Sequence, residues 1–182
     1  MTAHPKLTSV VLRPVGHVVG GRDEWVEDNW RGVRSVIRLD DEQFASSAVL
    51  GLDGFSHLEV VFHFDRIDPA EVRSEPRPPR GNPAWSPVGV FAHRGPYRPN
   101  LLGVSCCRLL GVDGLDLHVA DLDALSGTPV LDVKPYLAEF APRDPVTQPQ
   151  WATDLMGDYY TASQDRAQPA AGQARDGVPL KY

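Results

Sequence analysis

The stretch His57-Leu58-Glu59-Val60-Val61-Phe62-His63-Phe64 is rich in residues that favour an extended backbone, and it predicts a strand over residues 57–64. Upstream, residues 48–52 predict a further strand, which ends at the turn signal Asp53-Gly54. Downstream, residues 103–110 and 115–119 predict two strands joined by a hairpin turn at 111–114. This part of the chain therefore favours antiparallel β-structure.

The remaining strands are predicted from short runs between prolines and glycines. They cover an opening strand over 9–12 and 15–19 that bends at Pro14, an alternating stretch over 33–39, and short strands over 88–92 and 129–133. Many short strands at this spacing indicate a small barrel or a sandwich. The 182 residues include 16 glycines and 17 prolines, and this also favours strands and turns, because both residue types disfavour long helices.

Length and composition exclude several classes of protein. A chain of 182 residues fits one domain with a hydrophobic core. The formal net charge of -6 argues against a general nucleic-acid binder, although a local basic patch can suffice. No apolar run approaches the roughly 20 residues that span a bilayer, and the first residues have no apolar signal core. We therefore expect a cytoplasmic protein without membrane contact.

Metal-binding and redox chemistry find little support in the sequence. Cys106 and Cys107 are adjacent on a predicted strand and point to opposite faces, which excludes a disulfide framework and favours a core role. His57 and His63 are too far apart on an extended strand to hold one ion. We predict no metal site.

Two regions lack the alternation of the strands. Residues 73–87 are rich in proline and carry Arg73, Arg77 and Arg80, so they predict an extended basic loop. Residues 141–182 form a C-terminal extension after a domain over 1–140. We expect this extension to be poorly ordered from Thr161 on. Its aromatic part (Trp151, Leu155, Met156, Tyr159 and Tyr160) can alternatively dock on a neighbouring subunit.

Residues 89–105 are the densest in groups that can bind a ligand. Arg94 and Arg98 flank an aromatic ring in a segment that two prolines keep from becoming a helix. A stiff loop lowers the entropic cost of binding, so an anion or ligand site is one reading and a turn with solvated arginines is the other.

Residues 120–136 hold a second candidate group. The segment Ser126-Gly127-Thr128-Pro129 predicts a tight turn whose amides and hydroxyls can hold a polar ligand. Asp132, Lys134 and Tyr136 alternate and share one face of an extended chain. They form either a functional cluster or a structural ion pair of Asp132 with Lys134.

These segments resemble one family. Residues 89–105 are similar to the signature G-V-F-A-x-R-x-P-x-R-P-N-x-[IL]-G-[LV]-S of the TsaA-like (TrmO, YaeB) proteins. Residues 120–136 resemble their second signature, L-D-x-x-x-G-T-P-[VL]-[LV]-D-[IV]-K-P-Y, and residues 54–64 their G-F-S-H-L-W-V-x-F. Residues 13–18 resemble their opening P-I-G-x-V, so the match spans about residues 10 to 140 in the same order.

The resemblance implies an all-β fold, a small β-barrel of short, mostly antiparallel strands with short helical additions. It implies a homodimer that binds S-adenosyl-L-methionine near the subunit interface. It also implies methylation of the exocyclic nitrogen of threonylcarbamoyladenosine in tRNA. The positions that fall where the family contacts the cofactor are Asp65, Arg66, Arg94, Val104, Asp123, Leu125, Ser126, Gly127 and Thr128.

Roles for the remaining motif positions follow from their chemistry. An arginine suits the carboxylate of the cofactor, and Asp123 suits its amino group or ribose. Asp132 and Tyr136 are the candidates for a general base, which makes them the predicted catalytic residues. Arg98, Asn100 and Lys134 are predicted to contact the substrate.

Two departures from the family pattern concern the same site. Asp65-Arg66 stands where many members have His-Gln. Residues 23–30, with Trp25, Trp30 and four carboxylates, replace a Pro-Arg-Gln element. Because carboxylates repel phosphates, a different small acceptor is the alternative to tRNA, and a non-catalytic cofactor-binding module is a third possibility. The two tryptophans either stack on a planar substrate or cap the barrel.

Overall fold

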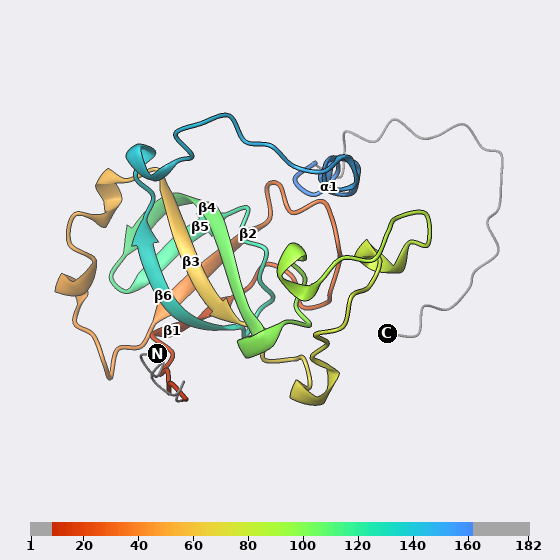
Figure 1. Cartoon of the computed structure of the whole chain (residues 1–182). Coiled ribbons are helices and arrows are strands. Elements are labelled where there is room, and N and C mark those ends of the chain that lie inside the picture. Colours follow the sequence, from red (N-terminus) through yellow and green to blue (C-terminus); the bar gives the residue numbers. More distant parts are fainter. Residues whose placement is uncertain (1–8, 162–182) are drawn as a thin grey trace, which may run out of the picture.

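The computed structural model describes residues 9–161, and within them six strands close into a barrel (Figure 1). The strands follow the order β1-β2-β5-β4-β3-β6, and every neighbouring pair is antiparallel. The all-β barrel predicted from the sequence is therefore confirmed. The strands are β1 (Gly16–Val19), β2 (Arg34–Leu39), β3 (His57–His63), β4 (Leu102–Asp113), β5 (Asp116–Ala120) and β6 (Pro129–Pro135).

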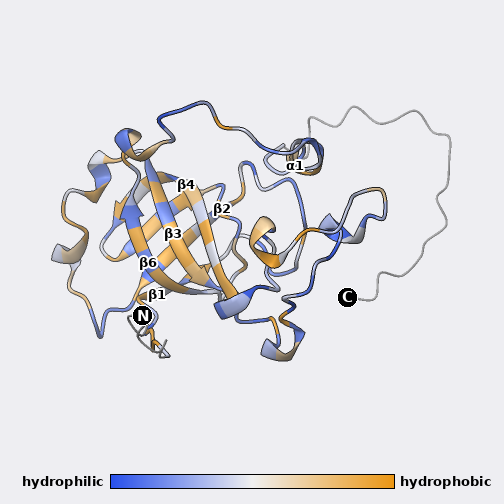
Figure 2. Ribbon diagram, viewed as in Figure 1, coloured by the Kyte–Doolittle hydropathy of each residue, from blue (hydrophilic) through white to orange (hydrophobic). Residues whose placement is uncertain are grey.

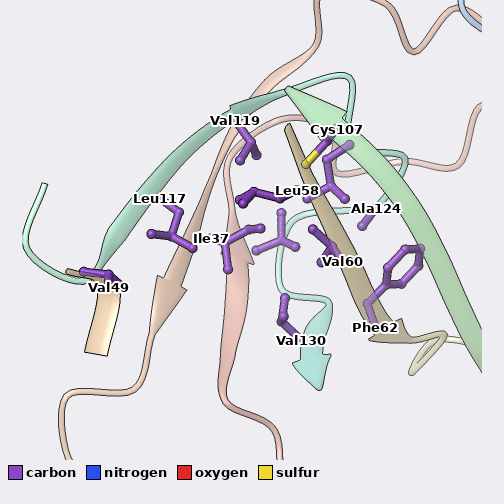
Figure 3. Close-up of a cluster of buried hydrophobic side chains, with 12 residues drawn as sticks. Ile37, Val49, Leu58, Val60, Phe62, Cys107, Leu117, Val119, Ala124 and Val130 are labelled. Atoms are coloured by element: carbon purple, nitrogen blue, oxygen red, sulfur yellow. The ribbon is translucent and has the colours of Figure 1, made fainter. Parts of the chain in front are cut away.

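Alternation along the strands builds the core inside the barrel. In β3, Leu58, Val60 and Phe62 point inward and are at most 1% exposed, while the residues between them are only partly buried. Side chains of the other strands and of the loop after β5 complete one cluster (Figure 3). Hydrophobic residues accordingly concentrate on the strands and hydrophilic ones on the loops (Figure 2). Burial of this cluster is the main force that holds the barrel together.

Four of the predicted strands match closely and three do not. The strands predicted over 33–39, 57–64, 103–110 and 115–119 correspond to β2, β3, β4 and β5. The hairpin turn falls at Gly114 and Leu115, so β4 extends three residues beyond Leu110. Residues 129–133 form the first part of β6, and 16–19 form β1.

The prediction was wrong for residues 9–12, 48–52 and 88–92. Residues 9–12 adopt no regular structure and are exposed, with Val11 94% accessible, because no strand of the described chain lies beside them. Residues 48–52 are taken up by two short 3-10 helices, separated by Gly51 at a φ of 81°. Only Val88 of the third segment pairs, in a single bridge to Arg77. A hydrophobic run becomes a strand only where a partner edge is available.

Short helices fill the connections between strands, as predicted. Within residues 9–161 they are η1 (Ser46–Val49), η2 (Leu52–Gly54), η3 (Pro69–Glu71), η4 (Pro79–Gly81), η5 (Val90–Ala92), η6 (Pro99–Leu101), η7 (Ala138–Phe140) and α1 (Gln150–Met156). Residues 73–87 are extended apart from η4, as expected for their prolines.

The C-terminal extension returns to the barrel of its own chain. After α1, the backbone amide of Asn29 donates to Asp158 O at 3.2 Å and that of Trp30 to Tyr159 O at 2.9 Å. Tyr159 is thus held by the barrel of its own chain. We expected poor order from Thr161 on. Almost all of these residues, 162–182, lie outside the described residues.

Gly103 tests the packing of the core. A Cβ added at Gly103 would lie 2.3 Å from the ring of Phe62, which is 1% exposed. We expect Gly103→Ala to lower the free energy of unfolding by about 1–3 kcal/mol, the usual cost of overpacking. Urea denaturation measures the change. Gly111→Ala, on the same strand with no atom within 4 Å of its added Cβ, is the matched control and should leave stability nearly unchanged. Equal stability of the two variants would contradict the prediction.

Candidate functional site

A cavity of about 40 Å³ lies between the loops that follow β1 and β3 and the loop that precedes β6. Five of the predicted cofactor-binding residues line it together: Asp65, Arg66, Asp123, Leu125 and Thr128. The rest of its wall is mainly apolar and comprises Trp25, Phe62, Phe64, Ile67, Pro96 and Ala124. The fold thus brings together positions that are more than 60 residues apart in the sequence.

Arg66 bridges two sides of this cavity. Its guanidinium donates from Nη1 to Asp23 O and from Nη2 to Ser126 O, both at 2.6 Å. Gly127 lies directly beside it, since a Cβ there would be 4.0 Å from Arg66 Nη2. The substitution of His-Gln by Asp65-Arg66 therefore places a cation against the turn 126–128, where it ties this turn to the acidic segment.

The turn 126–128 does not offer its amides to a ligand, contrary to expectation. The amide of Ser126 donates to Arg22 O, that of Gly127 to Val18 O, and that of Thr128 to Leu125 O. These bonds join the turn to β1 and the loop behind it. Gly127 suits the turn because its φ of +88° is unfavourable for other residues. Hydroxyl groups and the Asp123 carboxylate are then the polar groups that the loop 121–128 can present.

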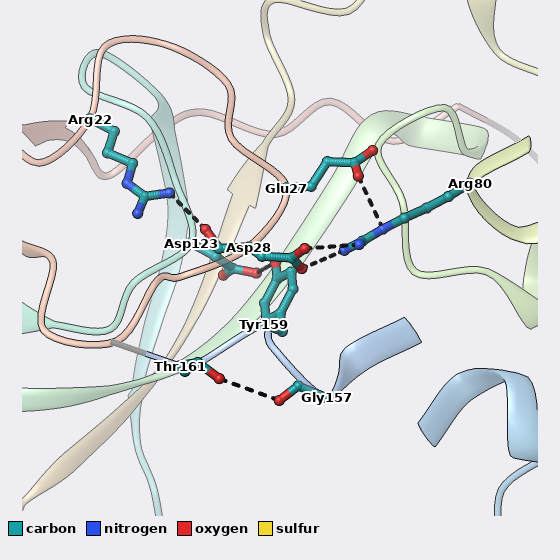
Figure 4. A network of polar contacts seen from close by, with 8 residues as sticks. All are labelled: Arg22, Glu27, Asp28, Arg80, Asp123, Gly157, Tyr159 and Thr161. Atoms are coloured by element: carbon teal, nitrogen blue, oxygen red, sulfur yellow. Dashed lines mark hydrogen bonds and ion pairs between the residues drawn. The ribbon is translucent and has the colours of Figure 1, made fainter. Parts of the chain in front are cut away.

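Only one of the two carboxylate oxygens of Asp123 accepts a hydrogen bond within residues 9–161. Its Oδ2 accepts a hydrogen bond of 2.5 Å from the phenol of Tyr159 (Figure 4). Its Oδ1 is buried and accepts no hydrogen bond from any residue within 9–161. A buried acceptor without a donor is costly and marks a place where a ligand donor fits.

Arg94 and Val104 stand next to each other on the outer side of β4. Arg94 Nη2 donates to Val104 O at 3.0 Å, and the Val104 side chain is 48% exposed. Neither residue lines the cavity. Tyr160 connects the two places, because it lies within electrostatic reach of both Arg94 and Asp123.

The predicted catalytic pair lies apart from the cavity. Asp132 and Lys134 are on β6, opposite Val61 and Glu59 of β3, and Tyr136 follows the strand. Lys134 pairs with Asp132, the ion pair that the sequence offered as the alternative to a functional cluster. None of the three is among the residues lining the cavity.

The predicted substrate residues Arg98 and Asn100 have structural roles in the loop before β4. Arg98 Nη1 donates to His93 O at 2.9 Å, which braces the loop from within. Asn100 has a φ of 64°, a conformation that asparagine tolerates better than most residues, and its side chain is exposed.

The acidic segment 23–30 is neutralised largely by the basic loop. Arg80 makes a two-pronged contact with Asp28, at 2.7 and 3.1 Å, and its Nε lies 3.4 Å from Glu27 (Figure 4). Two of the four carboxylates that we expected to repel phosphates are therefore paired with an arginine of the predicted basic loop. Asp23 and Glu24 remain exposed.

The two tryptophans of this segment have different environments. Trp30 is 1% exposed, and the Arg22 guanidinium lies 4.5 Å from the centre of its ring. Trp25 is 48% exposed and lines the cavity. Trp30 therefore caps the barrel, whereas Trp25 is the ring that can stack on a ligand.

A larger hollow of about 530 Å³ lies beside the start of β1 and the β4–β5 turn. In its lining, Arg38 pairs with Asp116 at 2.6 Å, and Asp40 accepts a hydrogen bond from Gln43. It contains none of the predicted site residues. Elsewhere in residues 9–161, no three His, Cys, Asp or Glu side chains gather closely enough to hold a metal ion.

Sequence reasoning missed the aromatic part of the wall. Phe62 and Phe64 belong to the predicted strand, but only its end position in the barrel turns them toward the cavity. Tyr159 was assigned to docking, and no spacing pattern links it to Asp123, 36 residues away. The alternation of β3 was the available signal for the first pair.

Comparison with known proteins shows the family of this chain. A family model, the tRNA-methyltransferase O N-terminal domain, matches residues 28–141. A human tRNA (adenine(37)-N6)-methyltransferase is 35% identical over 114 residues, which cover 63% of this chain and 25% of the human protein. A probable S-adenosyl-L-methionine-binding protein of Pyrococcus abyssi is 39% identical over 101 residues, or 56% of this chain and 52% of that protein.

A solved structure shares the fold. The crystal structure of TrmO from Pseudomonas aeruginosa superimposes with a TM-score of 0.63 at 26% identity, covering 79% of this chain and 62% of that one. The chain thus spans between a quarter and about half of the length of the two curated relatives. No helix within residues 9–161 is long and apolar enough to cross a membrane.

The environment of Tyr159 predicts a pH dependence of stability. Burial, and secondly the charge of Asp123, raise the pKa of the Tyr159 phenol above its usual value. The unfolded chain loses this proton near pH ~10, and the folded chain only at higher pH. The free energy of unfolding should therefore fall as the pH rises above ~10. Urea denaturation between pH 9 and 11 should show a smaller fall for Tyr159→Phe, and parallel curves would contradict the assignment.

Proposed function

Since the chain belongs to the family of tRNA-methyltransferase O N-terminal domains, we propose that it is an S-adenosyl-L-methionine-dependent N-methyltransferase. Its acceptor in this proposal is the exocyclic nitrogen of a modified adenosine, threonylcarbamoyladenosine, in tRNA. The observation that carries the proposal is the cavity in which five family positions converge around the half-satisfied carboxylate of Asp123.

The residues of the cavity fit this cofactor. Asp123 Oδ1 is a buried acceptor that suits a ribose hydroxyl or an ammonium group. The aromatic and aliphatic wall suits a purine ring, and Trp25 offers an exposed face for stacking. The hydroxyl of Thr128 adds a donor on the same wall.

Two arginines match the anionic part of the cofactor. Arg94 is exposed beside Val104 and suits a carboxylate. Arg66 closes the cavity through its bonds to Asp23 O and Ser126 O. Because a cavity of about 40 Å³ is smaller than a nucleoside needs, entry requires Arg66 to leave at least one of these carbonyls.

When bound, the cofactor supplies an electrophilic methyl group on a sulfonium centre. The chain's contribution is then to align the acceptor nitrogen with that methyl group and to exclude water. The apolar rings of Phe62 and Phe64 serve the second task. Methylation of a neutral nitrogen releases a proton, and Asp132 and Tyr136 remain our candidates to receive it. Their position outside the cavity requires an acceptor that extends along β6.

Pairing of charges favours tRNA over a small acceptor. Arg80 offsets Glu27 and Asp28, which removes much of the repulsion that these carboxylates would exert on phosphates. Arg73 and Arg94 are exposed on the loops around the site and can meet a phosphate backbone. Arg98, Asn100 and Lys134 are retained as candidate substrate contacts.

Two finer points belong to the same proposal. We place the protein in the cytoplasm, where tRNA is modified. We also propose a homodimer, supported by exposed hydrophobic side chains on one side of the barrel, Val104 at 48% and Phe91 at 80%. Light scattering at tens of micromolar concentration should give twice the chain mass of 20.0 kDa.

Asp123→Asn tests cofactor binding. The amide nitrogen of the asparagine would replace one carboxylate oxygen. A hydrogen-bond donor of the cofactor would then face another donor. We expect S-adenosyl-L-methionine to bind at least about tenfold more weakly by calorimetry, which is the scale of a lost hydrogen bond to a charged group. Asp113→Asn, on the exposed end of β4, should bind like the wild type. Equal affinity of both variants would contradict the placement of the cofactor.

Arg73→Glu tests the acceptor. Transfer of a labelled methyl group to total tRNA should fall severalfold, and tRNA affinity should weaken steeply with added salt. Arg13→Glu, on the far side near Asp40, is the control and should transfer normally. Cofactor binding without transfer to tRNA, but with transfer to a small acceptor, would favour the alternative substrate. Cofactor binding without transfer to any acceptor would favour a non-catalytic module.

A further inference from the structure

The segment 157–161 lies beside Asp123, which it contacts through Tyr159. Tyr159 donates its phenol hydrogen to Asp123 Oδ2 and is itself not among the residues that line the cavity. Tyr160 packs edge-on against Tyr159, with ring centres 5.0 Å apart. Figure 4 shows the phenol and the carboxylate directed toward each other.

We propose that Tyr159 is a positioning residue for Asp123. Its phenol fixes one carboxylate oxygen, so that the other oxygen, Oδ1, is held ready to accept a hydrogen bond from a hydroxyl or ammonium group of the cofactor. This inference rests on the proposed binding of S-adenosyl-L-methionine in the cavity.

The two oxygens of Asp123 carry the first step of the argument. Oδ2 has its donor, whereas Oδ1 is buried and accepts no hydrogen bond within residues 9–161. A carboxylate held by one strong hydrogen bond cannot rotate freely, so the direction of Oδ1 is set by Tyr159. Orientation of a binding group by an outer partner of this kind often changes ligand affinity by an order of magnitude or more.

The anchoring of the segment carries the second step. The amides of Asn29 and Trp30 donate to the carbonyls of Asp158 and Tyr159. Trp30 is fully buried, and the guanidinium of Arg22 covers its ring while donating to Asp28 O and Asn29 O. Tyr159 therefore stands on a rigid base, which is what a positioning residue needs.

The position of Tyr159 also bears on whether the segment 157–161 supports Asp123 or blocks the cofactor. A segment that blocked the cofactor would fill the cavity and satisfy every polar atom in it. Tyr159 instead leaves Oδ1 without a donor and is not among the residues that line the cavity. The segment lies beyond residues 28–141, which the family model covers, so this chain supplies the support from its own extension.

The test compares Tyr159→Phe with Thr161→Val by calorimetric titration with S-adenosyl-L-methionine. The first variant keeps the ring and loses the hydrogen bond, and we expect about tenfold weaker binding. The second removes a hydroxyl of the same segment that donates to Gly157 O and is not bonded to Asp123, and we expect a change of less than about twofold. Equal affinity of Tyr159→Phe and wild type overturns the proposal, and tighter binding to Tyr159→Phe indicates that the segment competes with the cofactor.

Hydrogen exchange separates a reoriented carboxylate from a detached segment. In Tyr159→Phe the amide of Trp30 should stay as protected as in the wild type, because its bond to the carbonyl of residue 159 remains. In the wild type, added cofactor should increase this protection. Loss of protection on adding cofactor would mean that the segment leaves its place, which overturns the proposal.

The failure of this inference is distinguishable from that of the proposed function. If the wild-type chain does not bind S-adenosyl-L-methionine, the proposed function fails. If the wild type binds and Asp123→Asn does not, the cofactor site stands, and Tyr159→Phe alone decides the positioning role. In the double variant, the effect of Tyr159→Phe should shrink to less than about twofold, because the carboxylate it orients is gone.

Discussion

The barrel closes where β1 meets β6, and the candidate site depends on this seam. The pairing is short, with Gly16 opposite Val130 and His17 opposite Pro129. On its other side β1 pairs with β2, where Gly16 is needed because a Cβ there would lie 2.2 Å from Arg38 O. Beyond the strands the seam continues as loop contacts, in which the turn 126–128 bonds to Val18 and Arg22. The hydrogen bonds that close the barrel are thus the same ones that shape the cavity wall, and this is why the turn has no amide left for a ligand.

Electrostatics in this acidic protein are organised by pairing between segments distant in sequence. Arg80 joins the proline-rich loop to Glu27 and Asp28, and Arg66 joins the loop after β3 to the carbonyls of Asp23 and Ser126. Both arginines are partly exposed, so each contact adds little to stability on its own. Their effect is geometric, because they fix the acidic segment against the mouth of the cavity. The sequence alone predicted that the carboxylates of the acidic segment repel phosphates. In the structure, arginines from distant segments lie beside this segment, so that its charge is largely balanced.

The strands that could be predicted from the sequence are those whose own residues carry a recognisable hydrophobic pattern. The alternation in β3 and the paired runs of β4 and β5 identify strands without knowledge of their neighbours. Residues 9–12 and 48–52 have similar composition, yet they lack an edge to pair with, and only the tertiary structure supplies that fact. In the site, family signatures identified Asp65, Arg66, Asp123, Leu125 and Thr128, which do converge. They did not reveal that Asp132 and Tyr136 are not among the residues that line the cavity, because a shared strand face says nothing about which face borders the cavity.

Trp25 and Trp30 show how little a residue type says without its surroundings. Both stand in one acidic segment, and the sequence offers stacking or capping for each. The positive φ of 65° at Asn29 turns the chain between them, so that Trp30 enters the barrel end under Arg22 while Trp25 stays at the cavity. The amides of Asn29 and Trp30 then receive the C-terminal segment, and with it Tyr159 reaches Asp123. A segment that departs from the family pattern therefore provides both the exposed ring at the site and the base on which the support of Asp123 rests.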